Sequence, residues 1–365
     1  MRIFNPSKDI DDIIQERGLR LQDVIKVIPP KYKKPQEWRS WLCFFRVIAS
    51  MALCLSLLLS LPLSWDQSLL WTLPSLLILW LIYGAVLLGF FLVGHECGHT
   101  SFSKYSWVNQ IVGHLCMAPF FNGFHTWVLT HNHHHTRTQI RGEDVDWSSH
   151  LVTDEELAQM NWKDNFAIKL GYSIPFGIFF WIFWNAIQRG SRVRPMLRPN
   201  IYERNRTVLN RSNRLMILCT TSVYALFWVQ TGFWGMILYH HIPISIASLL
   251  GGIMVSIGHA NINSIWFEQK NWSPIRGQLV STYDYRFPKW LEFLVLNINI
   301  HIPHHLCVRI PWYHLKKAAS LLQKEFPDIY QNHNFRWKDM AWIVRAPTIS
   351  YDPDSGMYQL QNSRT

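Results

Sequence analysis

The distribution of hydrophobic and polar residues predicts a membrane protein with four helical crossings. Four apolar runs have about the length that a bilayer-spanning helix needs; they cover residues 43–63, 69–93, 215–239 and 242–257. The turns within the two pairs, at residues 62–67 and 240–243, contain no Lys or Arg. Because positive charge gathers in cytosolic loops, we expect both turns on the outer side and the four crossings to form two hairpins.

A fifth apolar run, at residues 166–187, is expected to lie along the membrane surface. It precedes a segment, residues 189–214, that carries eight arginines and one acid, Glu203. We expect such an arginine-rich segment in the cytosol. The polar residues before the run lie on the same side if they form one site together with residues further along the chain. A run with both ends on one side is an interfacial or re-entrant helix.

The predicted fold is therefore all-α and integral to the membrane, with four transmembrane helices in two hairpins, interfacial helices and a His-rich cytosolic cap. Residues 1–40 are expected to form a cytosolic lead-in, because they are charged and lack the apolar core of a signal peptide. Residues 41–305 form the membrane-embedded domain, and residues 306–365 a cytosolic tail that packs on the cap.

Composition and charge agree with a membrane location. Hydrophobic residues make up 49% of the chain and charged residues 16%, with a formal net charge of +11. The basic residues flank the apolar runs, which fits the positive-inside rule and contact with anionic lipid or an acidic protein better than nucleic-acid binding. The six cysteines include no CxxC pair, so reduced, buried thiols are expected.

Three histidine clusters carry the predicted chemistry, each at a cytosolic membrane edge. Eight of the 17 histidines form these clusters, and a ninth lies outside them. The first cluster is an HxxxH and the other two are HxxHH patterns; they comprise His95 and His99, then His131, His134 and His135, then His301, His304 and His305. Residues three and four apart share a face of a helix, so each cluster directs two or three imidazoles to one point. Neutral imidazole is the commonest side-chain metal ligand, so the clusters indicate a metal centre.

Two details refine the predicted ligand set. His133 points off the face that its neighbours share, and Pro303 places His301 at the start of a helix, because proline is accepted in the first turn. His259, alone at the end of an apolar run, is expected to be the ninth ligand. Ligating imidazoles usually have polar partners on their second nitrogens; the candidates are Glu96, Asp144, Asp146 and Asn299.

An all-histidine site of this size favours iron. Two metals with four or five imidazoles each would use all nine histidines, which leaves little room for the tetrahedral coordination of zinc. The phrase His95-Glu-Cys-Gly-His99 also matches the HExxH motif of zinc proteases, but such an enzyme needs only one further ligand. A metal transporter would place its ligands midway through the crossings instead.

These motifs resemble those of the membrane fatty acid desaturases. The resemblance runs from about Leu21 to Tyr358 and rests on phrases such as GHECGHTSFSKYSWVNQIVGH, APFFNGFHTWVLTHNHHH, YRFPKWLEFLVLNINIHIPHHL and YDPDSGMY. The five-residue first box is similar to the acyl-lipid Δ12/ω3 branch, and the surrounding phrases to cyanobacterial Δ12 acyl-lipid desaturases. The resemblance implies two iron ions held by the eight box histidines and by His259.

The resemblance also implies the reaction and its partners. The enzyme would introduce a cis double bond, at Δ12, into acyl chains of membrane glycerolipids with dioxygen as co-substrate and two electrons from an external donor such as ferredoxin. Its membrane would be the plasma or thylakoid membrane if the source is cyanobacterial. An ω3 desaturase, or a lipid or carotenoid hydroxylase or ketolase of the same histidine-box superfamily, remains an alternative.

Overall fold

The structure is a computed structural model that describes residues 6–61, 69–145, 151–166, 199–336, 348–353 and 355–360. Several sequence-based predictions fall outside these residues. They are the turn at residues 62–67, the interfacial helix beyond residue 166, the arginines before residue 199 and the candidate polar partner Asp146.

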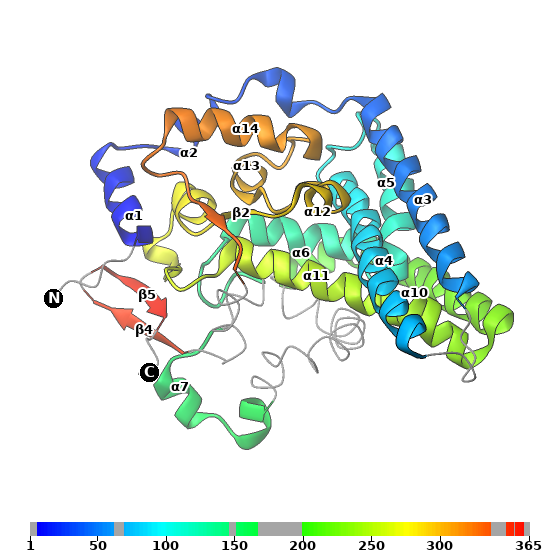
Figure 1. The fold of residues 1–365 in the computed structure, drawn as a ribbon. Helices are drawn as coiled ribbons and strands as arrows, with labels where there is room; N and C mark the ends of the chain where they lie inside the picture. The colour runs from blue at the N-terminus through cyan, green and yellow to red at the C-terminus, as the bar shows by residue number, and fades with distance from the viewer. Residues whose placement is uncertain are drawn as a thin grey trace.

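The described chain is mostly helical (Figure 1). The amino-terminal part contains α1 (Pro6–Glu16), α2 (Leu21–Ile25), the 3-10 helix η1 (Pro30–Lys33), α3 (Glu37–Ser60), α4 (Leu69–Gly98), α5 (Ser106–Met117), the 3-10 helix η2 (Ala118–Phe120), α6 (Phe124–Arg137) and α7 (Asp154–Gln159). The remainder contains α10 (Pro199–Met236), the π-helix η4 (Ile237–His241), α11 (Ile242–His259), the 3-10 helix η5 (Gln269–Asn271), the π-helix η6 (Arg276–Val280), α12 (Lys289–Leu294), α13 (His301–Leu306) and α14 (Trp312–Glu325).

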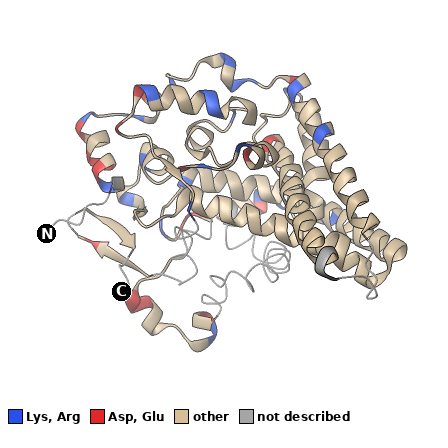
Figure 2. Cartoon of the chain, viewed as in Figure 1, with Lys and Arg blue, Asp and Glu red and all other residues tan. Residues whose placement is uncertain are grey.

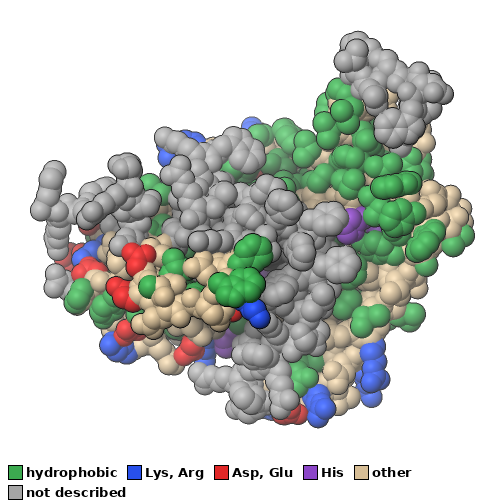
Figure 3. All heavy atoms as spheres, turned by 90° about the horizontal axis from the view of Figure 1, so that it is seen from below, with side chains coloured by type: hydrophobic (Ala, Val, Ile, Leu, Met, Phe, Trp, Pro, Cys, Tyr) green, Lys and Arg blue, Asp and Glu red, His purple; other side chains and the backbone are tan. Residues whose placement is uncertain are grey.

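Among the residues that the structure describes, three helical segments are long and apolar enough to cross a membrane, which makes this a helical membrane protein. They are Glu37–Ser60, Thr72–Gly98 and the continuous segment Ile201–His259, which at 59 residues has the length of two crossings. Hydrophobic side chains gather over the part of the molecule built from α3, α4 and α10 (Figure 3). The four runs predicted to cross therefore lie in long helices as far as Ser60 for the first run and in full for the other three, although α3 begins earlier and α4 ends later than the apolar pattern indicates.

The predicted turn at residues 240–243 is wrong. His240 and His241 lie in the π-helix η4, which leads directly into α11, and Pro243 occupies the first turn of that helix. The non-helical residue in this region is Gly232, with φ 70°. Proline is tolerated in a first turn and glycine readily adopts positive φ, so the break falls at the glycine.

The helix α5, between the first two histidine clusters, is absent from the sequence-based prediction. It packs on α4, where a Cβ at Gly94 would lie 2.8 Å from the Met117 side chain. Its other face exposes Trp107, Ile111 and Leu115, each more than half exposed and spaced four residues apart. An apolar stripe of this kind beside spanning helices suits a helix lying at a lipid surface.

Two small sheets in the part of the chain beyond α11 correct the expectation of an all-α fold. One is antiparallel with the order β1 (Ile265–Phe267), β5 (Met357–Leu360), β4 (Ile349–Asp352), and the other pairs β2 (Asp284–Arg286) with β3 (Asn332–Asn334) in parallel. β1 is fully buried, and its register pairs Trp266 with Tyr358. The sheet thus joins the end of the chain to the segment that follows α11.

A second hydrophobic core lies outside the spanning helices and supports the third histidine cluster. It packs Ile302 and Leu306 of α13 with Leu315 of α14, together with Val24 and Ile28 from the amino-terminal segment. In Figure 1, α14 lies near the upper edge of the molecule, just below the segment that joins α2 to α3, with α13 between α14 and the helices α6 and α11. This core therefore holds α13 over the ends of the long helices.

Candidate metal centre

The first histidine cluster lies at the end of α4, with His95 in its last turn and His99 directly after its last residue. His95 and His99 are both buried, and their ring centroids are 4.7 Å apart. The helix ends at Gly98, where a Cβ would come 2.8 Å from the ring of Trp127 on α6. The close approach of α4 and α6 at this glycine brings the first two clusters together: the Nε2 atoms of His95 and His131 are 3.2 Å apart.

The second cluster occupies one face of α6, as its spacing predicts. His131, His134 and His135 turn inward, and the Trp127 ring stacks on His131 with centroids 4.2 Å apart. His133 leaves this face, and its Nε2 lies 3.0 Å from the backbone oxygen of Glu143. The prediction that His133 stands apart from its neighbours is confirmed.

The third cluster forms the short helix α13, and His301 is its first residue, as Pro303 predicts. A buried carboxylate holds this start in place, because Asp284 Oδ1 accepts hydrogen bonds from the backbone amides of His301 (2.7 Å) and Ile302 (2.8 Å). The Tyr330 hydroxyl donates to the other oxygen of Asp284. Burial raises the pKa of Asp284 to about 7, against the lowering effect of these hydrogen bonds.

The outlying histidine, His259, joins the clusters at the last residue of α11. It is fully buried, and its Nε2 lies 2.8 Å from that of His301 and 3.1 Å from that of His134. The preceding Gly258 makes the approach possible, since a Cβ there would lie 2.6 Å from the His301 ring. Placement next to two clusters is what the prediction for His259 requires.

All nine predicted histidines converge into adjoining sets. In the first histidine group, the ligating nitrogens of His95, His99, His131 and His304 lie within 4.8 Å of one another. The same holds for the second histidine group, His134, His259 and His305. His135 forms a third set with His304 and His305, and His301 joins the second group through its Nε2, 3.1 Å from that of His305. The two groups are therefore neighbours, linked by His135.

Two of these imidazoles have a fixed hydrogen-bond partner on the second nitrogen. His134 Nδ1 donates to Asp144 Oδ1 at 2.7 Å, as the sequence predicts, and His305 Nδ1 donates to Gln278 Oε1 at 2.8 Å. Gln278 also donates to the backbone oxygen of His135. Because Nδ1 carries the proton in both rings, Nε2 presents a lone pair to the centre. Gln278 escaped the sequence-based prediction, as a single glutamine far from the boxes has no recognisable pattern.

Two other predicted partners do not face a ring nitrogen at hydrogen-bond distance. Glu96 Oε2 accepts from the Ser101 hydroxyl and from the backbone amide of Trp312, and its Oε1 is 3.8 Å from His95 Nδ1. Asn299 donates to the Tyr285 backbone oxygen and to Glu292. In the described residues each side chain braces a neighbouring segment, and a role for either as the partner of a ligating imidazole stays a prediction.

The electrostatics of the centre suit a cation. Burial lowers the pKa of His131, His135, His304 and His305 well below the ordinary value, and that of His301 to about 3, so these rings are neutral. Neighbouring Nε2 atoms approach within 3.2 Å, and in the described chain both nitrogens of His99 lack a hydrogen-bond partner. Lone pairs crowded in this way are favourable when they share a metal ion.

The zinc protease alternative fits this geometry poorly. In an HExxH enzyme the glutamate serves as the general base beside the metal-bound water. Here the Glu96 carboxylate is occupied by Ser101 and the start of α14. The described site also brings together nine histidines, where such a protease uses three protein ligands.

The long apolar helices and the converging imidazoles define a helical membrane protein whose histidine clusters are able to bind metal. A family model described as fatty acid desaturase matches residues 72–337, which include every histidine of the two groups. The chain belongs to the fatty acid desaturase family and is a membrane oxidoreductase.

Relatives with assigned activities cover nearly the whole chain. The sn-1 oleoyl-lipid 12-desaturase of Synechocystis is 31% identical over 353 residues, 96% of this chain and 93% of the relative. The protein of the same name from Anabaena variabilis is 29% identical over 96% of this chain and 95% of its own length. The chloroplastic omega-6 fatty acid desaturase of Glycine max is 27% identical over 94% of this chain and 76% of its own length.

Proposed function

We propose that this protein is an acyl-lipid Δ12 desaturase that inserts a cis double bond into oleoyl chains of membrane glycerolipids. The observation that carries the proposal is the convergence of nine histidines, eight of them buried, from three helices and one helix end into two adjacent groups. The position and the lipid substrate follow the relatives, which are named as sn-1 oleoyl-lipid 12-desaturases and omega-6 desaturases.

The proposed topology has four crossings in two hairpins, formed by α3 with α4 and by α10 with α11. The clusters then share one side, since His95 and His99 lie at the end of α4 and His259 ends α11. The described arginines of α10, from Arg204 to Arg214, lie at its first turns, next to α6. Positive charge at that end supports a cytosolic location for the metal centre. A plasma or thylakoid membrane would fit a cyanobacterial source.

Two iron ions are the proposed cofactors, with the nine histidines as their ligands: His95, His99, His131, His134, His135, His259, His301, His304 and His305. The donor set fits iron because imidazole suits it and the number of rings exceeds what tetrahedral zinc uses. When bound, the iron pair supplies dioxygen activation and the abstraction of hydrogen from an acyl methylene. Asp144 and Gln278 orient their histidines, and burial keeps the rings neutral and ready to bind.

The overall reaction sets what the protein must receive. The acyl chain loses two hydrogen atoms, that is two protons and two electrons, one hydrogen from each of two adjacent methylenes. Two further electrons and two protons from outside complete the reduction of one dioxygen to two waters. The protein must hold the acyl chain with one carbon–carbon bond near the metals, because selectivity for that bond depends on its position. We propose a ferredoxin as the external electron donor.

Expression in a host that makes only monounsaturated lipids tests the proposal. Gas chromatography of its fatty acids should show a new Δ12 diene, and the purified protein should contain about two irons per chain. His131→Ala and His304→Ala should abolish the product while the protein still inserts into the membrane. His133→Ala is the matched control, because His133 lies on the same helix but outside both groups.

Three outcomes would contradict the proposal in different ways. A double bond at ω3, counted from the methyl end, would replace the regiochemistry but keep the enzyme class. A hydroxylated product would replace desaturation by oxygen transfer at the same centre. Active protein without iron would remove the proposed cofactor.

A further inference from the structure

Five basic side chains form a patch on the face of the molecule beyond the third histidine cluster. We call it the α14 basic patch; its members are Lys31, Lys33 and Lys34, which adjoin one another in the chain, with Arg39 and Lys317. Two aromatic rings carry three of these cations. The Lys31 and Lys317 nitrogens lie 5.3 and 5.8 Å from the Tyr32 ring centre, and the Arg39 guanidinium lies 5.4 Å from that of Tyr313.

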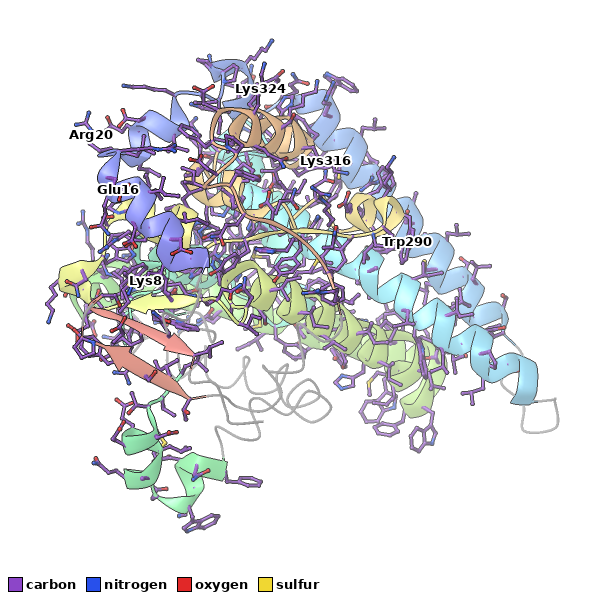
Figure 4. All side chains as sticks on the ribbon, turned by 60° about the vertical axis from the view of Figure 1, so that its left-hand side comes forward. Lys8, Glu16, Arg20, Trp290, Lys316 and Lys324 are labelled. Atoms are coloured by element: carbon purple, nitrogen blue, oxygen red, sulfur yellow. The ribbon has the colours of Figure 1, made fainter. Side chains whose placement is uncertain are left out.

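The positive charge of this patch is not neutralised within the described chain. None of its five members forms an ion pair with a described carboxylate. Its neighbours differ in this respect, since Lys316 pairs with Glu292 at 2.6 Å and Arg17 pairs with Asp328. Figure 2 shows Lys and Arg along this edge of the molecule, and Figure 4 shows Lys324 at the outer edge of α14 and Lys316 on the side nearer Trp290 of α12. Unpaired cations gathered in one place attract an acidic partner.

The patch lies on the direct route to the histidine groups. Its helix, α14, packs against α13, which carries the third cluster. The Tyr313 hydroxyl, under the patch, accepts a hydrogen bond from the backbone N–H of Gln36 at 2.6 Å. The preceding residue, Trp312, donates its backbone N–H to Glu96 Oε2 at 3.0 Å, and Glu96 adjoins His95 in the chain. One hydrogen bond therefore links the backbone under the patch to the first histidine group.

We propose that the α14 basic patch is the docking surface for a small acidic electron-transfer protein, which delivers electrons through the start of α14 toward His95. The inference rests on the proposed function, because a desaturase needs two external electrons for each double bond. A one-electron donor is oxidised once at each encounter, and its electron is accepted by the metal centre. Two encounters therefore supply one turnover.

Placement on the cap favours a protein partner over anionic lipid. The lipid-facing stripe of α3 is formed by the exposed Trp38, Leu42 and Phe45. Lys31 and Lys317 instead flank Tyr32, whose ring packs 4.9 Å from that of the buried His314 on α14. The two lysines thus lie on the outer surface of the cap, over α14 and not on the apolar stripe.

Binding to a plant-type [2Fe–2S] ferredoxin, in nanodiscs of zwitterionic lipid, tests the docking surface. The double variant Lys31→Glu/Lys317→Glu should bind about tenfold more weakly than the wild type and show a shallower dependence on salt. Lys163→Glu, an exposed lysine of the described chain away from α14, is the matched control and should bind like the wild type. The neutral variant Lys31→Gln/Lys317→Gln, with an intermediate loss, separates a charge effect from misfolding.

Turnover measurements separate this inference from the proposed function. With ferredoxin as donor, the charge-reversal variant should need a higher donor concentration for half-maximal rate. With dithionite as a chemical reductant, it should form product as the wild type does. Unchanged ferredoxin binding, or a loss only in binding to anionic vesicles, would overturn the docking surface. A wild type that forms no product even with dithionite would overturn the proposed function instead.

Discussion

The Glu96 carboxylate and the backbone N–H of Trp312 are 3.0 Å apart, although 216 residues separate them in sequence. This hydrogen bond ties the end of α4, where the first cluster lies, to the first residue of α14. Trp312 follows Pro311, and no side chain of its own helix caps this N–H. Glu96 therefore satisfies a helix start that would otherwise leave a partly buried donor unpaired.

Glu96→Ala is expected to destabilise the protein by about 2 kcal/mol, because it leaves the Trp312 amide and the Ser101 hydroxyl without their acceptor. Glu96→Gln keeps an acceptor oxygen and should retain most of the product. Thermal unfolding in detergent and fatty acid profiling measure the two effects. A complete loss of activity in well-folded Glu96→Gln protein would point to a chemical role for the carboxylate.

Gly258→Ala should remove most of the bound metal. The new Cβ would lie 2.6 Å from the His301 ring and would push that imidazole away from His259. The matched control is Gly252→Ala on the same helix, where no atom lies within 4 Å of the added Cβ. Elemental analysis of both purified variants gives the answer, and equal metal content in the two would contradict the described packing of α11 on α13.

Gln278→Met should weaken metal binding about 10- to 100-fold, because the His305 ring loses the acceptor that sets its orientation. Gln278→Glu retains an oxygen for His305 but loses the donor to the His135 backbone, so a smaller loss is expected. Competition with a metal chelator measures both affinities. If the Gln278→Met variant binds metal as tightly as the wild type, the position of His305 is set by the packing of α13 alone.

His314 should make the protein less stable in acid. Burial, with help from Arg39 and Lys317, lowers its pKa to about 4, from an ordinary value of 6.5. Between these values the unfolded chain takes up a proton that the folded chain does not, so stability falls as the pH falls from about 6.5 to 4. His314→Phe removes this difference and leaves no unpaired ring nitrogen.

The measurement is the change in melting temperature between neutral and acidic pH, compared for wild type and His314→Phe. The melting temperature of the variant should fall less on acidification than that of the wild type. Loss of metal ligation in acid lowers the melting temperature of both proteins equally. Parallel pH profiles would show that His314 is protonated as readily in the folded state as in the unfolded state.

The histidine spacings and the apolar runs could be read directly from the sequence because both depend on local periodicity. The end of α4 directs His95 and His99 to one side, and Pro303 places His301 first in its helix. Asp144 was also predictable, since it lies ten residues from His134 and returns to it through a short turn. Local patterns of this kind constrain local geometry, and the family resemblance lies in the same residues.

Long-range packing decided the remaining features. Gln278, 27 residues before His305, becomes its partner only when η6 folds against α13. Glu96 resembled a catalytic or orienting carboxylate in the sequence, but its carboxylate accepts a hydrogen bond from the first residue of α14. The pairing of β1 with β5, the amphipathic surface of α5 and the break at Gly232 also depend on segments distant in the chain or on backbone freedom at one residue. The sequence by itself determined which side chains were available to bind metal; only the tertiary structure decided which of them meet, because a contact between distant segments depends on the packing of everything between them.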